Sequence, residues 1–212
     1  MRDKTIVIVG CGPGSPDYLT PAAKRAVEGA HVLVGAARLL ELFPSSMAER
    51  IVVGSDVEKV LGEISSRRSQ GRVAVLVSGD PGLYSLALPV ISRFGRDACE
   101  VVPGISSVQV VFARLGLGWH DANVVSVHGR PAEGDMERLR DADKIAVLVG
   151  GGGSVRRIVE LLEQLGEGRR VFLCEDLTLP GERIRQVDPG ELSRLPNVGR
   201  GIVLLLNDGV FV

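Results

Sequence analysis

Aromatic residues and cysteines are scarce in this sequence of 212 residues. Phe, Trp and Tyr together supply 4% of it, so the interior has to be built from Val, Leu, Ile and Ala, the mix expected of α/β layers. The three cysteines, Cys11, Cys99 and Cys174, are far apart and match neither a disulfide framework nor a zinc-binding spacing. We therefore expect a protein of the reducing cytoplasm without a protein-bound metal.

The sequence also lacks net charge and long apolar runs. Its 25 Lys and Arg against 26 Asp and Glu leave a formal charge of −1, so no overall field attracts nucleic acid or an anionic membrane. No apolar stretch approaches membrane-spanning length, and residues 1–4 lead directly into a strand rather than into a signal-type run. We expect no nucleic acid and no membrane among the partners, and an acidic ligand would have to meet a local basic patch.

What is present is organised around residues 73–85, which read VAVLVSGDPGLYS. Five consecutive aliphatic residues without alternation predict a strand buried on both faces, as in a parallel sheet. Gly79, Pro81 and Gly82 then end the strand, so Asp80 is expected on a tight turn at its carboxyl end. Open α/β sheets bind their ligands at this position.

Similar apolar runs along the chain predict a two-domain α/β fold. Helices are expected at residues 21–28, after Asp56 and at 84–94, and further strands at residues 5–9, 31–34, 50–53, 99–102, 123–127, 144–149, 170–174, 183–187 and 201–206. The last strands lack long crossovers, which predicts a partly antiparallel sheet. Residues 116–121 break the periodicity as a hinge would, dividing the chain into domain 1–117, with a mostly parallel sheet, and domain 118–212, with a mixed sheet.

The first glycine loop, residues 10–14, invites comparison with dinucleotide-binding loops. That fingerprint needs a third glycine or alanine where this chain has Ser15, and an acidic residue after the second strand, which here ends in Gly35. A carboxylate at Asp80 in the neighbouring turn would also repel a pyrophosphate. The remaining interpretation from the residues alone is that these glycines form a tight turn.

Four turns follow one another along the chain: GPG at 12–14, GDP at 79–81, VPGISS at 102–107 and the glycine-ended strand at 149–150. In this order they resemble the turns of the tetrapyrrole methylases, which transfer a methyl group from S-adenosylmethionine to the macrocycles of sirohaem and cobalamin synthesis. Further stretches, GLYS at 82–85, LGWHDA at 117–122 and SVHGR at 126–130, are similar to the branch that methylates carbon 5 of precorrin-7. Some organisms fuse that activity to a carbon-15 methylating decarboxylase, and we expect only the carbon-5 module here.

The resemblance implies an S-adenosylmethionine site in a cleft between the two domains. A sulfonium cofactor needs peptide carbonyls and amides at close range, which glycine and proline turns expose. The residues implied as cofactor contacts are Pro13, Ser78, Gly79, Asp80, Leu83, Ser106, Ser107, Val149 and Leu177. Asp80 has a second interpretation, as an acceptor that stiffens its own turn.

Methyl transfer from a sulfonium to an electron-rich carbon needs positioning more than it needs acid or base groups. The only acid–base group expected is a modest base that removes a proton from the methylated carbon. His120 and His128 are the candidates for this base. Tyr84, Arg114 and Arg130 are expected to bind the macrocycle and its carboxylates. Each of these five residues also has a plain structural interpretation, as a packing residue or a solvated charge.

Several alternatives stay open at this point. One is a tetrapyrrole methylase that acts at another macrocycle position, and another is a non-catalytic protein that binds S-adenosylmethionine or the macrocycle. The resemblance also implies a homodimer and allows a separate carbon-15 methylase as a partner. Whether the substrate carries cobalt does not follow from the sequence.

Overall fold

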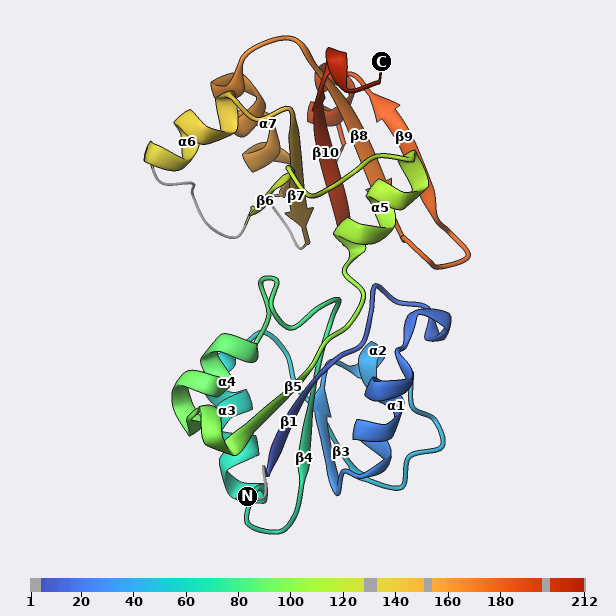
Figure 1. The fold of residues 1–212 in the computed structure, drawn as a ribbon, viewed down its shortest axis with the longest axis vertical. Coiled ribbons are helices and arrows are strands. Elements are labelled where there is room, and N and C mark those ends of the chain that lie inside the picture. Colours follow the sequence, from blue (N-terminus) through green and yellow to red (C-terminus); the bar gives the residue numbers. More distant parts are fainter. Residues whose placement is uncertain (1–4, 128–132, 151–153, 196–198, 212) are drawn as a thin grey trace. The chain divides into compact units, whose positions relative to one another are not determined.

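The computed structural model describes residues 5–127, 133–150, 154–195 and 199–211. The chain forms two compact units, Met1–Ser106 and Ser107–Val212, each built on a five-stranded sheet (Figure 1). Helix α5, Ser107–Leu115, belongs to the second unit because it packs against that unit's strand β10, Gly201–Asn207. The sequence pattern alone placed this helix before the domain boundary, since nothing local shows which sheet a helix will cover.

The sheet of the first unit is entirely parallel, with strand order β3-β2-β4-β1-β5. Its strands are β1 Ile6–Gly10, β2 Val32–Gly35, β3 Glu49–Val52, β4 Val73–Val77 and β5 Cys99–Val102. The strand expected at the centre of the chain is confirmed as β4, in which every residue is buried. The mostly parallel sheet predicted for this half is confirmed as well.

Helices cover both faces of this sheet (Figure 1). They are α1 Pro21–Glu28, α2 Ala37–Leu40, α3 Val57–Arg67 and α4 Ala87–Phe94, with 3₁₀ turns at Pro16–Tyr18 and Arg96–Ala98. Successive residues of β1 serve opposite faces: Ile8 packs in the core beneath α3 and α4, and Val9 in the core beneath α1 and α2. This double burial is why the strands read as unbroken apolar runs.

The order of the strands determines where this unit can hold a ligand. After β1 the chain crosses β4 to reach β2, and after β4 it crosses β1 in the other direction to reach β5. The carboxyl ends of β1 and β4 therefore lie side by side where the winding reverses. In open α/β sheets the ligand binds at this switch point.

The second unit has a mixed sheet, as the sequence predicts. Its strand order is β6-β7-β10-β8-β9, in which β6 and β7 are parallel and the other neighbours are antiparallel. The remaining elements are β6 Asn123–Ser126, α6 Glu133–Arg140, β7 Lys144–Val149, α7 Ser154–Leu165, β8 Arg169–Glu175, β9 Arg183–Val187, α8 Pro189–Ser193 and a 3₁₀ turn at Asp208–Phe211. Helices α6, α7 and α8 share one apolar core with the sheet through residues such as Leu139, Ile158 and Leu192.

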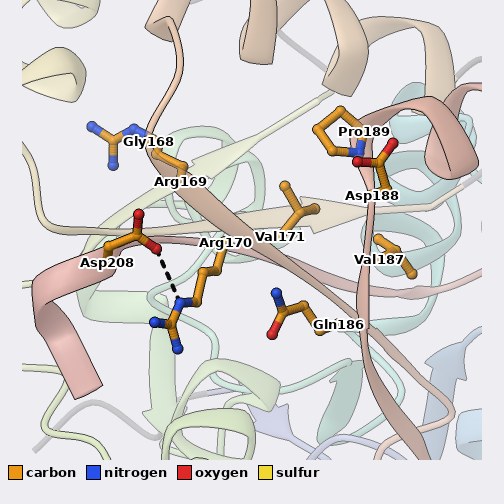
Figure 2. A pocket seen from close by; sticks show the side chains of 9 residues that line it. All are labelled: Gly168, Arg169, Arg170, Val171, Gln186, Val187, Asp188, Pro189 and Asp208. Atoms are coloured by element: carbon orange, nitrogen blue, oxygen red, sulfur yellow. Dashed lines mark hydrogen bonds and ion pairs between the residues drawn. The ribbon is translucent and has the colours of Figure 1, made fainter. Parts of the chain in front are cut away.

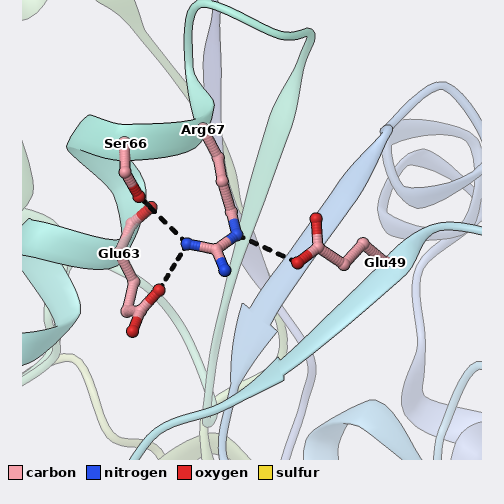
Figure 3. Close-up of polar contacts among 4 residues, drawn as sticks. All are labelled: Glu49, Glu63, Ser66 and Arg67. Carbon is pink, nitrogen blue, oxygen red and sulfur yellow. Dashed lines mark hydrogen bonds and ion pairs between the residues drawn. The ribbon is translucent and has the colours of Figure 1, made fainter.

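An ionic cluster ties the edge strand β3 to helix α3 (Figure 3). The Arg67 guanidinium donates to Glu49 of β3 at 3.1 Å and to Glu63, one turn back on α3, at 2.5 Å. It also donates to the Ser66 hydroxyl at 2.9 Å. One partly buried cation thus neutralises two carboxylates on different elements.

We expect Arg67→Ala to lower the free energy of unfolding by about 1 kcal/mol, because it leaves Glu49 and Glu63 without their shared cation. Arg156→Ala is the matched control, since Arg156 is 85% exposed and pairs with Glu160 along the same helix. This control should change stability by less than about 0.5 kcal/mol. Urea unfolding followed by circular dichroism measures both, and equal losses would contradict a cross-element role for Arg67.

Candidate functional site

Two loops of the first unit are joined backbone to backbone at the switch point. The Cys11 amide donates to the Val77 carbonyl at 2.9 Å. Beyond it, Gly12 and Gly79 exchange hydrogen bonds of 3.3 and 2.8 Å and form an isolated antiparallel bridge. The glycine loop after β1 and the GDP turn after β4 are therefore held together as one structure. We call these two loops, together with residues 103–106 after β5, the loop floor.

Glycine is required in this floor because three backbones touch. A Cβ on Gly104 would lie 2.3 Å from the Gly79 carbonyl oxygen, and one on Gly10 would lie 2.5 Å from the Gly104 nitrogen. Gly79 also has a φ of +65°, which favours glycine. The interpretation of the glycines as a tight turn is thus incomplete, since they also permit close approach between three strand ends.

The Asp80 carboxylate fastens two of these three segments, the loops after β4 and β5. One oxygen accepts from the Gly82 amide at 2.8 Å, and the other accepts from the Gly104 amide at 3.1 Å. The first bond is the turn-stiffening interaction expected from the sequence. The second links the β4 loop to the β5 loop, which no local pattern indicated.

Six of the residues implied as cofactor contacts gather on this floor or beside it. They are Pro13, Ser78, Gly79, Asp80, Leu83 and Ser106. Ser106 is 7% exposed, and Ser78 is exposed. Residues 11–15, 78–84 and 103–106 include no Lys, Arg or His, so these three loops themselves supply hydroxyls, peptide groups and one carboxylate. That set of groups fits a ligand with a sulfonium and an ammonium better than it fits a phosphate.

Tyr84 lies in a strained conformation beside the floor. Its φ is +47°, which is uncommon for a bulky residue, and it is 61% exposed. Helix α4 starts at Ala87, not at residue 84 as the sequence predicts, because a residue with positive φ cannot belong to a right-handed helix. Strained residues of this kind cluster at functional sites.

In the second unit, Val149 and Leu177 share one edge of the sheet. Val149 pairs with Gly201 and Gly201 with Glu175, so the end of β7, the start of β10 and the end of β8 lie in a row. Leu177 follows β8 and is 4% exposed. Ser107, the third residue implied as a cofactor contact in this unit, begins α5.

Arg114, expected to bind a substrate carboxylate, already has a carboxylate partner. Its Nε donates to Glu182 Oε1 at 2.6 Å and its Nη2 to Glu182 Oε2 at 3.3 Å. This pairing and the Thr178 amide hold the pKa of Glu182 below its usual value. Glu182 is a residue that the sequence analysis missed, because 68 positions separate it from Arg114.

His120 lies away from Val149 and Leu177. It is in the turn before β6, and its side chain is 88% exposed. The adjacent Asp121 accepts two bonds from Lys144, at the start of β7, and these hold the pKa of Asp121 below its usual value. Val149 ends β7, so His120 is at the opposite edge of the sheet. His128 and Arg130 lie outside the described residues.

The three cysteines are buried, and none of them is part of a disulfide. Burial raises the pKa of Cys11 to about 12 and that of Cys174 to about 12, so neither forms a reactive thiolate at neutral pH. Cys11 is therefore a small apolar filler beneath the floor. Among the residues that the structure describes, no three His, Cys, Asp or Glu gather to hold a metal, and no helix in those ranges has the length and apolarity of a membrane span.

A pocket of about 540 Å³ lies elsewhere in the second unit (Figure 2). Its wall includes Arg170, whose Nε donates to Asp208 at 3.0 Å, together with Gln186 and Asp188. It lies at the amino end of β8, whereas Leu177 follows the carboxyl end of the same strand, about 20 Å away. The pocket thus belongs to a different edge from the implied cofactor contacts of this unit.

Comparison with known proteins identifies the class. Residues 5–193 match the model of the tetrapyrrole (corrin/porphyrin) methylases. The chain belongs to this family, as its turns predict, and the two-sheet fold is that of its solved members.

Individual relatives show which members of the family the chain resembles. The chain is 34% identical to the cobalt-precorrin-7 C(5)-methyltransferase of Salmonella typhimurium over 84% of its length and 88% of that protein. It is similar to the precorrin-6Y methylase of Archaeoglobus fulgidus, with 27% identity and a TM-score of 0.70 over 95% of this chain and 96% of that one. A uroporphyrin-III C-methyltransferase of Thermus thermophilus, in complex with S-adenosylhomocysteine, shares the fold at 24% identity, a TM-score of 0.74 and coverage of 96% and 92%.

We expect Gly104→Ala to lower the free energy of unfolding by about 3 kcal/mol, since its Cβ would overlap the backbone of Gly79 and Gly10. Gly62→Ala is the control: nothing lies within 4 Å of its Cβ, and it is inside α3. This control should raise stability by up to about 1 kcal/mol. Urea unfolding measures both, and a neutral Gly104→Ala would show that the three loops are not in contact.

Proposed function

We propose that this protein transfers a methyl group from S-adenosylmethionine to carbon 5 of precorrin-7 or its cobalt complex, in cobalamin synthesis. The observation that carries this proposal is the 34% identity with a cobalt-precorrin-7 C(5)-methyltransferase across 84% of the chain. The loop floor supports the choice of methyl donor, because its hydroxyls, peptide groups and single carboxylate suit a cationic cofactor.

The donor supplies an electrophilic methyl group on a sulfonium, and the protein's own residues hold and aim it. We propose that Ser78, Gly79 and Asp80 contact the donor from the first unit, with Pro13, Leu83 and Ser106 beside them. Ser107, Val149 and Leu177 are the proposed contacts in the second unit. Because hydrogen bonds and close backbone contacts fix the shape of the floor, we propose that positioning supplies most of the rate and that little acid or base chemistry is needed.

The substrate has its own proposed contacts. Tyr84, exposed beside the floor, is proposed to pack on the macrocycle, and Arg130 to pair with one of its carboxylates. Of the two candidate bases, His120 is at the sheet edge opposite Val149, so we propose that methyl transfer depends on it only weakly. The homodimer and the separate carbon-15 methylase stay predictions from the family resemblance.

The first experiment combines purified protein with isotopically labelled S-adenosylmethionine and cobalt-precorrin-7 made by upstream enzymes. Mass spectrometry and NMR then locate the label. We expect methyl at carbon 5, and a parallel reaction with metal-free precorrin-7 shows which form is preferred. Methyl at another carbon would mean that the protein is a tetrapyrrole methylase with a different specificity. Binding of the donor without transfer would mean that it is a non-catalytic binding protein.

Two substitutions test the assignment of roles. Asp80→Ala removes the acceptor of two loop amides and should lower kcat/KM by about a hundredfold, since misplacement of bound groups costs that much. His120→Ala should retain partial activity, with a loss of at most about tenfold. Steady-state kinetics with S-adenosylmethionine measure both. A larger loss in His120→Ala than in Asp80→Ala would reverse this assignment.

A further inference from the structure

The loop between β8 and β9 holds Leu177 between two strained residues. Asp176 has a φ of +50° and Thr178 a φ of +71°. Neither is glycine, so both conformations cost free energy and persist only where surrounding contacts impose them. Leu177 is 4% exposed, although it lies in a connection between strands. The loop is therefore held in one shape by specific interactions.

Glu182 supplies those interactions at the far end of the loop. Its Oε2 accepts from the Thr178 amide at 2.6 Å, while its own amide donates to the Leu179 carbonyl at 2.9 Å. The Leu179 amide in turn donates to the Asp176 carbonyl at 2.9 Å. The carboxylate thus fixes the backbone directly after Leu177, and it can do so only while its own position is fixed.

Arg114 fixes that position from another element. Its two donors engage both Glu182 oxygens, at 2.6 and 3.3 Å, in the fork geometry that a guanidinium and a carboxylate share. Arg114 is in the last turn of α5, the helix that Ser107 begins. The ion pair therefore connects α5, which carries Ser107, to the β8–β9 loop, which carries Leu177. The Glu182 side chain is only 23% exposed.

We propose that Arg114 and Glu182 are positioning residues for the methyl donor, which act by setting the shape of residues 176–179 and with it the place of Leu177. This inference rests on the proposed function for the identity of the donor. It gives Arg114 a role different from the one expected from the sequence, since its guanidinium already binds a protein carboxylate. The pair acts through Leu177 and touches no reacting atom.

The test compares Glu182→Ala, Arg114→Ala and the double variant with wild type. Each is measured for S-adenosylmethionine affinity by calorimetry, for KM and kcat, and for melting temperature. We expect the dissociation constant and KM for the donor to rise about tenfold in each single variant, with kcat changed by less than about twofold. The double variant should be no worse than either single one, because both remove the same clamp.

Matched variants separate positioning from general stability. Glu160→Ala breaks the exposed Arg156–Glu160 pair of α7 and should leave donor affinity unchanged. Glu182→Gln keeps an oxygen for the Thr178 amide and should restore part of the affinity, and Arg114→Lys keeps the charge but loses the fork. These two milder variants keep the test decisive if the alanine variants fail to fold.

Two results would overturn the inference. One is unchanged donor affinity in folded Glu182→Ala and Arg114→Ala or, if these do not fold, in both Glu182→Gln and Arg114→Lys. The other is a fall in kcat at constant KM that tracks a loss of folded protein. Neither affects the proposed function, which the wild-type reaction tests separately. Conversely, these variants could bind the donor more weakly while the wild type methylates another carbon. That result would support the role of the Arg114–Glu182 pair and would contradict carbon 5 of precorrin-7 as the site of methylation.

Discussion

The contact between three glycine backbones at the carboxyl ends of β1, β4 and β5 is the constraint on which the first unit depends. Gly10, Gly79 and Gly104 approach so closely that a single methyl group at Gly104 would overlap its neighbours. This contact brings together loops that lie far apart in the sequence. Asp80 fastens the loops after β4 and β5 by accepting from one amide of each. The result is a floor of peptide groups held by hydrogen bonds and close contacts, and a fixed shape is what a reaction governed by positioning requires.

Strained backbone conformations occur in both units, and always beside a residue implied as a donor contact. Among the described residues, the non-glycine residues with positive φ are Tyr84, Asp176 and Thr178, and each is next to an implied donor contact. Backbone strain persists only when neighbouring bonds impose it. Thr178 has such a bond, from its amide to Glu182, and Tyr84 follows the turn that Asp80 stiffens. The hydrogen-bonding carboxylates are therefore better understood as structural clamps than as acids or bases.

The sequence was most informative where a feature depends on neighbouring residues. The unbroken apolar run of β4 and its abrupt end predict a buried strand and the turn at Asp80, and both are present. The start of α4 was missed because the left-handed conformation of Tyr84 depends on the folded turn. The Arg114–Glu182 pair was missed because it joins positions 68 residues apart. The location of His120 could have been deduced, since it precedes one strand of a parallel pair and Val149 ends the other.

The contrast between the tightly packed floor and the exposed side chains around it suggests how one fold serves several reactions. Solved proteins named for different macrocycles share this two-sheet architecture, so the fold alone does not determine which carbon receives the methyl group. The floor is built from backbone contacts that tolerate almost no change, whereas Tyr84 projects from it with 61% of its surface exposed. Under the proposed function, a change at such an exposed side chain would alter the surface offered to the macrocycle without disturbing the backbone contacts of the floor. On that proposal, residues around the floor would set the position of methylation on the macrocycle, and the floor itself would hold the methyl donor that these reactions share.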